Sequence, residues 1–228
     1  MFLIRSLCLL WLVPVSWIDA ILVRKKPFEV RYQHMQKWAD RLMKCYGVVL
    51  KVKQTEELPQ NCPILFVSNH QSEFDMLLQM AAVDIPFTFI SKKENEKIPY
   101  VGSWSKTLEL IFFDREDRGS AIHMLREAAR RLKKGDNLLI FPEGTRSKGG
   151  KMHPLQAGSL QPAFMSKACI VPIVLENSYD YKNVMMGKGA FTVHILKPLF
   201  YEDYKSLKAE GAIALLQEEM ENILKDNG

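Results

Sequence analysis

A histidine and an aspartate five residues apart are the side chains in this chain best suited to acid–base chemistry. They stand in the run Asn69-His70-Gln71-Ser72-Glu73-Phe74-Asp75, between an apolar stretch typical of a buried strand (63–68) and one typical of a buried helix (76–83). On one continuous helix the two side chains would point about 140° apart. Across a strand-to-helix turn they can meet, and an imidazole held by a carboxylate is the usual general base for a hydroxyl proton.

Both residues also have an ordinary structural interpretation. Ser72 and Asp75 have the spacing of a capping box, so Asp75 can serve to accept backbone N–H groups at a helix start. His70 can be a polar residue that closes a strand. The spacing leaves both interpretations open, and residues further along the chain favour the catalytic one.

Polar or charged residues follow the ends of four predicted strands, at His70, Lys92, Arg115 and Arg146. In open α/β sheets, ligands bind beyond the carboxyl ends of the strands, so these side chains are expected at one cleft. Cations beside an imidazole indicate an anionic substrate with a hydroxyl group, and guanidinium groups suit phosphate. Each has a plain alternative: a solvated turn at Lys92-Lys93, a local ion-pair cluster at Asp114-Arg115-Glu116 and an ordinary turn at Glu143-Gly144.

Apolar runs typical of strands alternate with helical patterns along the chain. The predicted strands are 48–52, 64–67, 87–90, 110–113, 137–141, 170–175 and 191–195. The predicted helices are 76–83, a short one opening at 98–102, 118–134, 157–167 and a closing amphipathic helix through Ile213, Leu216, Met220 and Ile223. This alternation predicts an α/β fold, a mostly parallel mixed sheet flanked by helices, over residues 47–228.

The excess positive charge lies in the N-terminal fifth. The chain has 228 residues, 47% of them hydrophobic, and a net charge of +5, as expected of one globular domain. Residues 1–46 hold eight Lys and Arg against three acids, whereas the remainder holds 23 of each sign. Residues 6–18 are uncharged but too short to span a bilayer easily, and Pro14 interrupts them.

A second N-terminal segment has the pattern of a basic amphipathic helix. Its apolar residues are Phe28, Tyr32, Met35, Trp38, Ala39, Leu42 and Tyr46, and its basic ones are Arg31, His34, Lys37, Arg41 and Lys44. Such a helix suits an anionic bilayer surface, so residues 1–46 are predicted to be a two-helix membrane-associated element. Two alternatives stay open: two helices packed on the domain, or a cleaved signal peptide, which the poor cleavage site Ile18-Asp19-Ala20 and the basic cluster after it oppose.

The four cysteines show neither a CxxC pair nor metal-ligand spacing. Cys8, Cys45, Cys62 and Cys169 are scattered along the chain, which predicts buried free thiols and a reducing compartment. With the N-terminal element this places the protein at a membrane on its cytoplasmic face, the inner membrane if the source is bacterial. No nucleic-acid-binding signature is present.

Four motifs in order resemble the glycerolipid acyltransferase family, most closely the bacterial 1-acyl-sn-glycerol-3-phosphate acyltransferases. The N-H-x-x-x-x-D pattern stands at 69–75, a second block at 111–115, the complete F-P-E-G-T-R-S at 141–147, and an apolar strand with a central proline at 170–174. The similar region covers roughly residues 48–200. The sequence departs from the family's usual pattern at Glu109, where glycine is common, and at Gln156, where a basic residue is common.

The resemblance implies roles for individual residues and a reaction. His70 would be the base and Asp75 its orienting partner, and the substrate would be bound by Lys92, Arg115, Glu143, Gly144, Thr145 and Arg146. The implied reaction moves a fatty acyl group from acyl-CoA or acyl-ACP, used as co-substrate, to the sn-2 hydroxyl of 1-acyl-sn-glycerol-3-phosphate, giving phosphatidic acid. The hydroxyl would attack the thioester directly, with neither a metal nor a cofactor.

Three other functions stay open. A sister acyltransferase would act on another lysolipid, such as a lyso-ornithine lipid. An inactive family member would serve as a lipid-binding membrane module. A metal hydrolase using His70, Glu73 and Asp75 is disfavoured, because ligands from a single turn rarely close a metal site.

Overall fold

A single mixed sheet organises the computed structural model, which describes residues 7–114, 116–149 and 151–226. Within this part of the chain, seven strands pair in the order β1-β7-β6-β2-β5-β3-β4. Their bounds are β1 Leu50–Gln54, β2 Ile64–Ser68, β3 Thr88–Lys92, β4 Ile111–Phe113, β5 Leu138–Ile140, β6 Cys169–Glu176 and β7 Phe191–Ile195. Strands β2 to β6 run parallel, β7 is antiparallel to β6, and β1 is parallel to β7. The predicted mostly parallel mixed sheet is confirmed, and each predicted run overlaps a strand.

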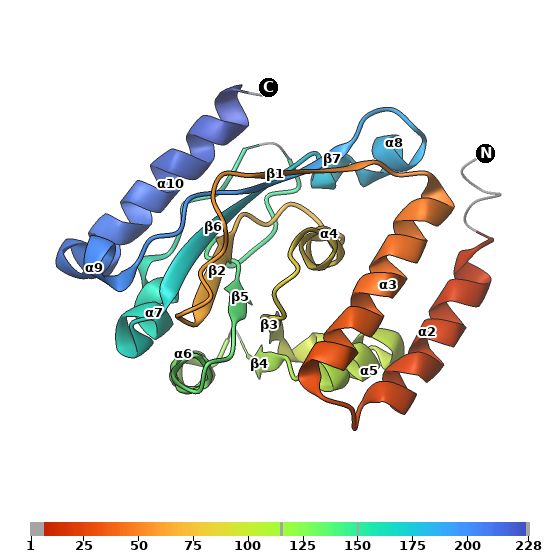
Figure 1. The fold of residues 1–228 in the computed structure, drawn as a ribbon, viewed down its shortest axis with the longest axis horizontal. Helices are drawn as coiled ribbons and strands as arrows, with labels where there is room; N and C mark the ends of the chain where they lie inside the picture. Colours follow the sequence, from red (N-terminus) through yellow and green to blue (C-terminus); the bar gives the residue numbers. More distant parts are fainter. Residues whose placement is uncertain (1–6, 115, 150, 227–228) are drawn as a thin grey trace.

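Helices cover both faces of this sheet. They are α2 Leu9–Val23, α3 Phe28–Tyr46, α4 Asp75–Ala82, α5 Pro99–Thr107, α6 Arg118–Lys133, α7 Gln161–Ser166, α8 Tyr181–Met185, α9 Tyr201–Tyr204 and α10 Lys208–Asp226, with short 3-10 turns η1 Lys93–Lys97, η2 Ala157–Leu160, η3 Ser178–Asp180 and η4 Lys205–Leu207. Helices α6, α7, α9 and α10 lie on one side of the sheet, and α2 to α5 lie on the other (Figure 1). Helices α8 and α9 fall in segments for which the sequence patterns predict no element.

Alternating side chains of the buried strands divide the core into two layers. In β2, Leu65 and Val67 belong to the apolar cluster that α6, α7 and α10 complete, whereas Ile64 and Phe66 belong to the cluster on the opposite face. All five residues of β2 are buried. Because a strand buried on both faces cannot shift register without exposing apolar surface, the position of β2 also fixes where the turn at His70 begins.

The amphipathic pattern of α3 faces the protein body. Tyr32, Met35, Ala39 and Tyr46 are buried, and Tyr32 and Met35 join the same cluster as the sheet and α4. The Tyr32 hydroxyl donates a hydrogen bond of 3.1 Å to the carbonyl oxygen of Val83. For α3, the alternative of a helix packed on the domain is therefore correct, because aromatic side chains at helical spacing bury against the nearest apolar surface.

Arg31, expected on the basic surface of α3, is buried and fastens the helix to the body. Its guanidinium donates to the Thr107 carbonyl oxygen at 2.8 Å and to Glu109 Oε1 at 2.6 Å. The Glu109 carbonyl oxygen in turn accepts a bond of 2.5 Å from Arg131 Nη1. Glu109 has a left-handed φ of +54°, a conformation that glycine adopts without strain. Its carboxylate pairs with the buried Arg31 guanidinium.

Helix α2 carries the exposed apolar surface of the N-terminal element. Ser16, Ala20 and Val23 form its buried stripe, next to α5 in Figure 1. Its remaining surface exposes large apolar side chains at Leu10, Trp11, Val15, Trp17, Ile18, Ile21 and Leu22. Pro14 lies within the helix and does not interrupt it as expected, because packing against the body holds the turn that lacks one main-chain hydrogen bond. None of the helices in the described residues is long and apolar enough to cross a membrane.

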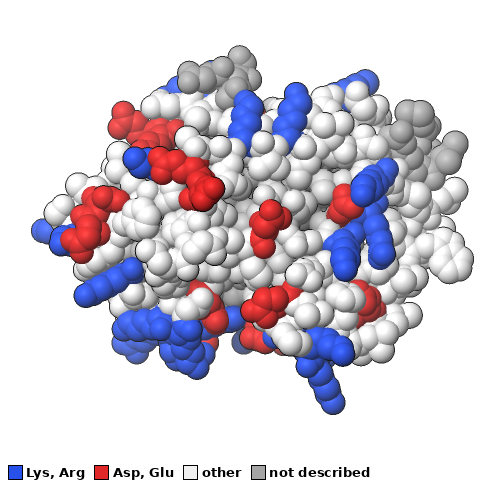
Figure 2. Space-filling view, in the orientation of Figure 1, with Lys and Arg blue, Asp and Glu red and all other residues white. Residues whose placement is uncertain are grey.

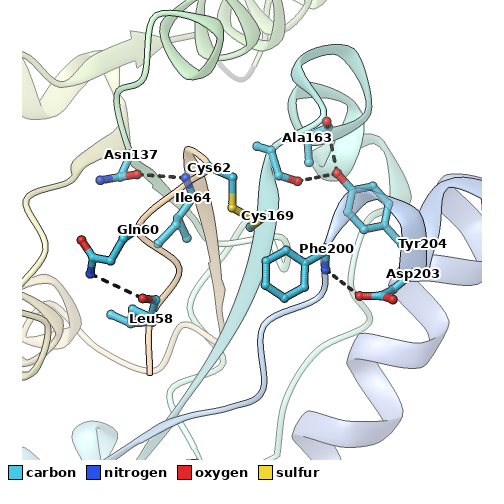
Figure 3. The surroundings of a disulfide bond; sticks show 11 residues. Leu58, Gln60, Cys62, Ile64, Asn137, Ala163, Cys169, Phe200, Asp203 and Tyr204 are labelled. Atoms are coloured by element: carbon cyan, nitrogen blue, oxygen red, sulfur yellow. Dashed lines mark hydrogen bonds between the residues drawn. A yellow bond between two sulfur atoms is a disulfide. The ribbon is translucent and has the colours of Figure 1, made fainter. Parts of the chain in front are cut away.

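The cysteines form two disulfides, so the prediction of free thiols is wrong. Cys8, just before α2, pairs with Cys45 in the last turn of α3. Cys62 pairs with Cys169, and this bond joins the segment before β2 to the first residue of β6 (Figure 3). Strands β2 and β6 are hydrogen-bonded neighbours with Ile64 opposite Cys169. Cysteines 107 residues apart are therefore adjacent in space, and their spacing in the sequence could not indicate this.

Candidate active site

The turn between β2 and α4 brings His70 and Asp75 together. His70 follows the end of β2, and Asp75 is the first residue of α4. Their side chains meet through a 2.6 Å contact between His70 Nδ1 and Asp75 Oδ2. Since the carboxylate accepts from Nδ1, the proton resides there, and Nε2 is left with the lone pair that takes a proton from a substrate.

The Asp75 carboxylate is fully buried and accepts hydrogen bonds from several donors besides the imidazole. The main-chain N–H groups of Gln71 and Ser72 reach Oδ2 at 2.7 and 3.0 Å. The hydroxyls of Ser72 and Ser178 reach Oδ1 at 3.1 and 2.6 Å. The two interpretations of Asp75 are thus both realised, because the same carboxylate satisfies the turn's backbone donors and holds the histidine.

An aromatic ring fixes the imidazole from the side. The His70 ring stacks on the ring of Phe141, with centroids 4.1 Å apart and planes inclined by 20°. Phe141 follows β5, the parallel neighbour of β2. The histidine side chain keeps 19% of its surface exposed, so it is held firmly yet remains open to a substrate.

The loop after β5 is attached to the same turn by Glu143. This carboxylate accepts the His70 main-chain N–H at 2.6 Å through Oε1 and the His153 main-chain N–H at 2.8 Å through Oε2. The Ser147 main-chain N–H donates to the His70 carbonyl oxygen at 2.8 Å. Burial raises the pKa of Glu143, and the hydrogen bonds from the two main-chain N–H groups oppose this rise. Glu143 therefore positions the histidine's backbone, and its oxygens are engaged within the protein.

The residues after Glu143 line the approach to the turn. Gly144 has a φ of +70°, and a Cβ there would lie 3.1 Å from Gln156 Nε2, so the position requires glycine. Thr145 is exposed. Arg146 is partly exposed and forms an ion pair with Glu73, which belongs to the His70 turn. The one guanidinium that the structure describes in this loop thus contacts the turn that carries the histidine.

Two further predicted site residues lie on neighbouring strands. Lys92 is exposed at the end of β3, which pairs with β5, so it lies two strands away from His70 along the carboxyl edge of the sheet. Arg115 falls outside the described residues. The strand before it, β4, is parallel to β3 and ends at the same edge.

The sequence analysis missed Ser178 and Gln71, which complete the hydrogen-bond network. Ser178 is fully buried at the first position of η3, just after β6, and its main-chain N–H donates to Gln71 Oε1 at 3.1 Å. The signal in the sequence is position alone: Ser178 follows the predicted strand 170–175, just as His70 and Lys92 follow theirs.

The arrangement can remove a proton from a hydroxyl group held near a cation. A histidine whose Nδ1 is bound by a buried carboxylate can act as a general base at Nε2, and Arg146 on the adjoining loop suits an anionic group on the same substrate. The described residues contain no cluster of three or more His, Cys, Asp or Glu side chains arranged to hold a metal ion.

Comparison with known proteins establishes the family. The family model described as Acyltransferase matches residues 49–176, which include every described element of the site except Ser178, so this chain belongs to that family. It is 32% identical over 164 residues to a 1-acyl-sn-glycerol-3-phosphate acyltransferase alpha of Ovis aries, an alignment that covers 70% of this chain and 57% of that protein. The chain thus spans little more than half the length of this relative.

A bacterial relative and a solved structure match over nearly the whole chain. The 1-acyl-sn-glycerol-3-phosphate acyltransferase of Haemophilus influenzae is 27% identical over 223 residues, covering 96% of this chain and 91% of the relative. The crystal structure of the 1-acyl-sn-glycerophosphate acyltransferase of Thermotoga maritima superposes with a TM-score of 0.73 over 97% of both chains. At 23% identity that superposition establishes the fold, including the N-terminal helices.

Replacing Glu143 with glutamine should destabilise the protein in a pH-dependent way. Glutamine replaces one accepting oxygen with an NH2 group that cannot accept a hydrogen bond, whereas a protonated carboxyl group keeps two oxygens. The free energy of unfolding of Glu143→Gln should therefore be about 1–3 kcal/mol lower than that of wild type near pH 4. Because burial raises the native pKa of Glu143, its protonated form stabilises the native state, and this contribution is lost as the pH rises through the native pKa. The difference in free energy of unfolding between wild type and variant, measured by urea titration, should therefore become smaller as the pH rises.

The control for this measurement is Glu219→Gln. Burial also raises the pKa of Glu219, but within the described residues its side chain accepts no hydrogen bond. This control should be at least as stable as wild type at neutral pH. A gap for Glu143→Gln that widens with rising pH would show that the ionised carboxylate itself stabilises the fold.

Proposed function

We propose that this protein transfers a fatty acyl group from acyl-CoA or acyl-ACP to the sn-2 hydroxyl of 1-acyl-sn-glycerol-3-phosphate, giving phosphatidic acid. The observation that carries this proposal is the attachment of the His70–Asp75 pair to the Glu143–Ser147 loop, which holds the base next to Arg146. The printed names of the matched relatives support the same reaction. The phosphate of the acceptor would lie at Arg146, and its hydroxyl at His70 Nε2.

The reaction follows from this placement. His70 Nε2 takes the proton of the sn-2 hydroxyl while the oxygen attacks the thioester carbonyl carbon, and Asp75 stabilises the imidazolium that forms. The tetrahedral intermediate then expels the thiolate, which takes the proton from His70. The ester bond forms as the thioester bond breaks, and neither a covalent acyl-enzyme nor a metal takes part.

The other predicted site residues take different parts in the proposal. Thr145 and Lys92 are exposed at the same sheet edge and can add hydrogen bonds to the phosphate, and Arg115 is proposed for the same role from its motif alone. Gly144 supplies the left-handed turn that presents Arg146. Glu143 is assigned to positioning, because both its oxygens accept main-chain N–H groups.

We further propose that the enzyme works on a membrane surface through α2. Trp11 and Leu22 are 78% and 71% exposed and belong to the apolar surface of this helix. A soluble monomer rarely exposes a contiguous apolar patch of this kind, and interfacial helices bury one in the headgroup region. The basic cluster Arg24-Lys25-Lys26 after α2 supports a location on the cytoplasmic face of the membrane. The two disulfides mean that free thiols no longer support a reducing compartment.

Removing the imidazole should nearly abolish acyl transfer. His70→Ala should lower kcat by about two to four orders of magnitude, because a general base contributes about that factor. Asp75→Asn should lower kcat by a comparable factor.

Ser178→Ala, which removes one donor to Asp75, should lower kcat about tenfold and move the acidic limb of the pH–rate profile while KM stays unchanged. The control is His123→Ala, an exposed histidine of α6, which should keep full activity. More than a tenth of wild-type kcat in His70→Ala would exclude it as the base.

Arg146 should matter only for acceptors that carry a phosphate. Arg146→Ala should lower kcat/KM for lysophosphatidate roughly ten- to a hundredfold, as expected for losing a charge-assisted hydrogen bond. The kcat/KM for a monoacylglycerol acceptor should change far less. Arg146→Lys keeps the charge but not the fork of donors, so it should also be impaired. Glu73→Gln frees the guanidinium of its partner and should lower KM for lysophosphatidate. Equal losses on both acceptors would assign Arg146 a structural role instead.

Charged substitutions on α2 should release the protein from vesicles. Burying a large apolar side chain contributes about 1.5–3 kcal/mol, so Trp11→Glu with Leu22→Glu should weaken binding to phosphatidylcholine vesicles more than tenfold in flotation assays. Ile98→Glu with Ile122→Glu places the same charges on exposed apolar sites of other elements and should leave binding unchanged. Undiminished flotation of the α2 variant would mean that another surface contacts the bilayer.

A further inference from the structure

A groove of about 340 Å³ runs between α2 and α3 and shares no lining residue with the candidate active site. Its α2 wall consists of the apolar Val15, Ile18 and Leu22 together with the acidic Asp19. The other wall belongs to α3 and is largely polar and basic; it consists of His34, Lys37, Trp38 and Arg41. Figure 2 shows blue side chains gathered over α3 beside the white surface of α2. Apolar side chains on one wall and cations on the other fit an amphiphile with a negative headgroup.

A polar contact across the groove joins the two helices. Asp19 is the one charged residue in α2, and its carboxylate accepts hydrogen bonds from Trp38 Nε1 at 2.6 Å and from the His34 ring at 2.9 Å. The Cys8–Cys45 disulfide joins the helices at one end, and the short turn after α2 joins them at the other. The site is therefore shaped before a ligand arrives, which lowers the cost of binding.

The cations of the groove are available to a ligand. Lys37 and Arg41 lie one helical turn apart on α3, and both are exposed. In the described part of the chain neither forms an ion pair, and the Arg41 guanidinium lies 4.4 Å from the centre of the Trp38 ring. The carboxylate of Asp19, by contrast, is engaged by Trp38 and His34. An anion entering the groove thus meets two cations that form no ion pair among the described residues, and a carboxylate whose oxygens already accept hydrogen bonds.

We propose that this groove binds a single anionic phospholipid of the bilayer. Lys37 and Arg41 would hold the phosphate, and the first part of an acyl chain would lie against Val15, Ile18 and Leu22. The volume is at the lower end of the range of ligand pockets, about 300–1,000 Å³, and suits a headgroup and the start of one chain. A zwitterionic lipid would bind less well, because its ammonium group would meet the same cations. The site is separate from the catalytic turn and does not depend on the proposed reaction.

The test measures binding of a monomeric short-chain lipid to the full-length protein by calorimetry. All proteins carry Arg146→Ala, so that the proposed acceptor site does not contribute. Dihexanoylphosphatidylglycerol should bind with one-to-one stoichiometry, at least about tenfold more tightly than either dihexanoylphosphatidylcholine or sn-glycerol 3-phosphate. Glycerol phosphate binding as tightly as the lipid would mean a phosphate site without a chain, and equal binding of both lipids would mean an apolar site. Either result overturns the proposal.

Matched variants separate the two walls. Lys37→Gln with Arg41→Gln should weaken phosphatidylglycerol binding at least about tenfold, whereas Lys51→Gln with Lys53→Gln, which removes the same charge from exposed positions of β1, should not. Ile18→Ser should weaken it about fivefold through lost apolar contact. Ile122→Ser is its control, because Ile122 is 51% exposed and Ile18 is 54% exposed. The proposal would be overturned if the Lys37/Arg41 variant bound phosphatidylglycerol with wild-type affinity. It would also be overturned if a groove variant and its matched control lost the same affinity.

Discussion

The buried carboxylate of Asp75 is the constraint on which the site depends. An isolated charge cannot be buried at this depth, so it must be surrounded by donors. The structure supplies them from the imidazole of His70, from two main-chain N–H groups and from the hydroxyls of Ser72 and Ser178. The shape of the turn, the orientation of the histidine and the position of the segment after β6 all follow from satisfying this one group.

Glu143, one strand away, is a second buried carboxyl group that accepts main-chain donors. Its two oxygens bind the backbone at His70 and at His153 and so join the loops after β2 and β5. A carboxylate in a strongly matched motif is readily interpreted as a ligand-binding group. Its burial and its partners indicate that it instead joins the His70 turn to the loop that carries Arg146, the residue proposed to bind the phosphate.

The N-terminal helices have both surfaces that pack on the protein body and surfaces that stay exposed, and their composition does not show which is which. Helix α3 uses its aromatic side chains and Arg31 to dock on the sheet domain, and α2 docks only along a narrow stripe of small residues. The apolar surface left on α2 and the basic surface left on α3 meet at the groove that the Asp19–Trp38 hydrogen bond bridges. One pair of helices can in this way serve both to pack on the enzyme and to contact lipid.

The sequence alone determined the strands and the longer helices between them, because hydrophobic period is encoded within a few residues, and it indicated that His70 and Asp75 can meet across a turn. It also indicated that polar residues after parallel strands converge, since parallel strands end at the same edge. Only the tertiary structure decided the rest. The roles of Ser178, Arg31 and Glu143 depend on partners distant in sequence, and the cysteine pairs depend on which strands are neighbours. Whether an apolar helix face meets protein or solvent likewise depends on the surface beside it, which no local pattern contains.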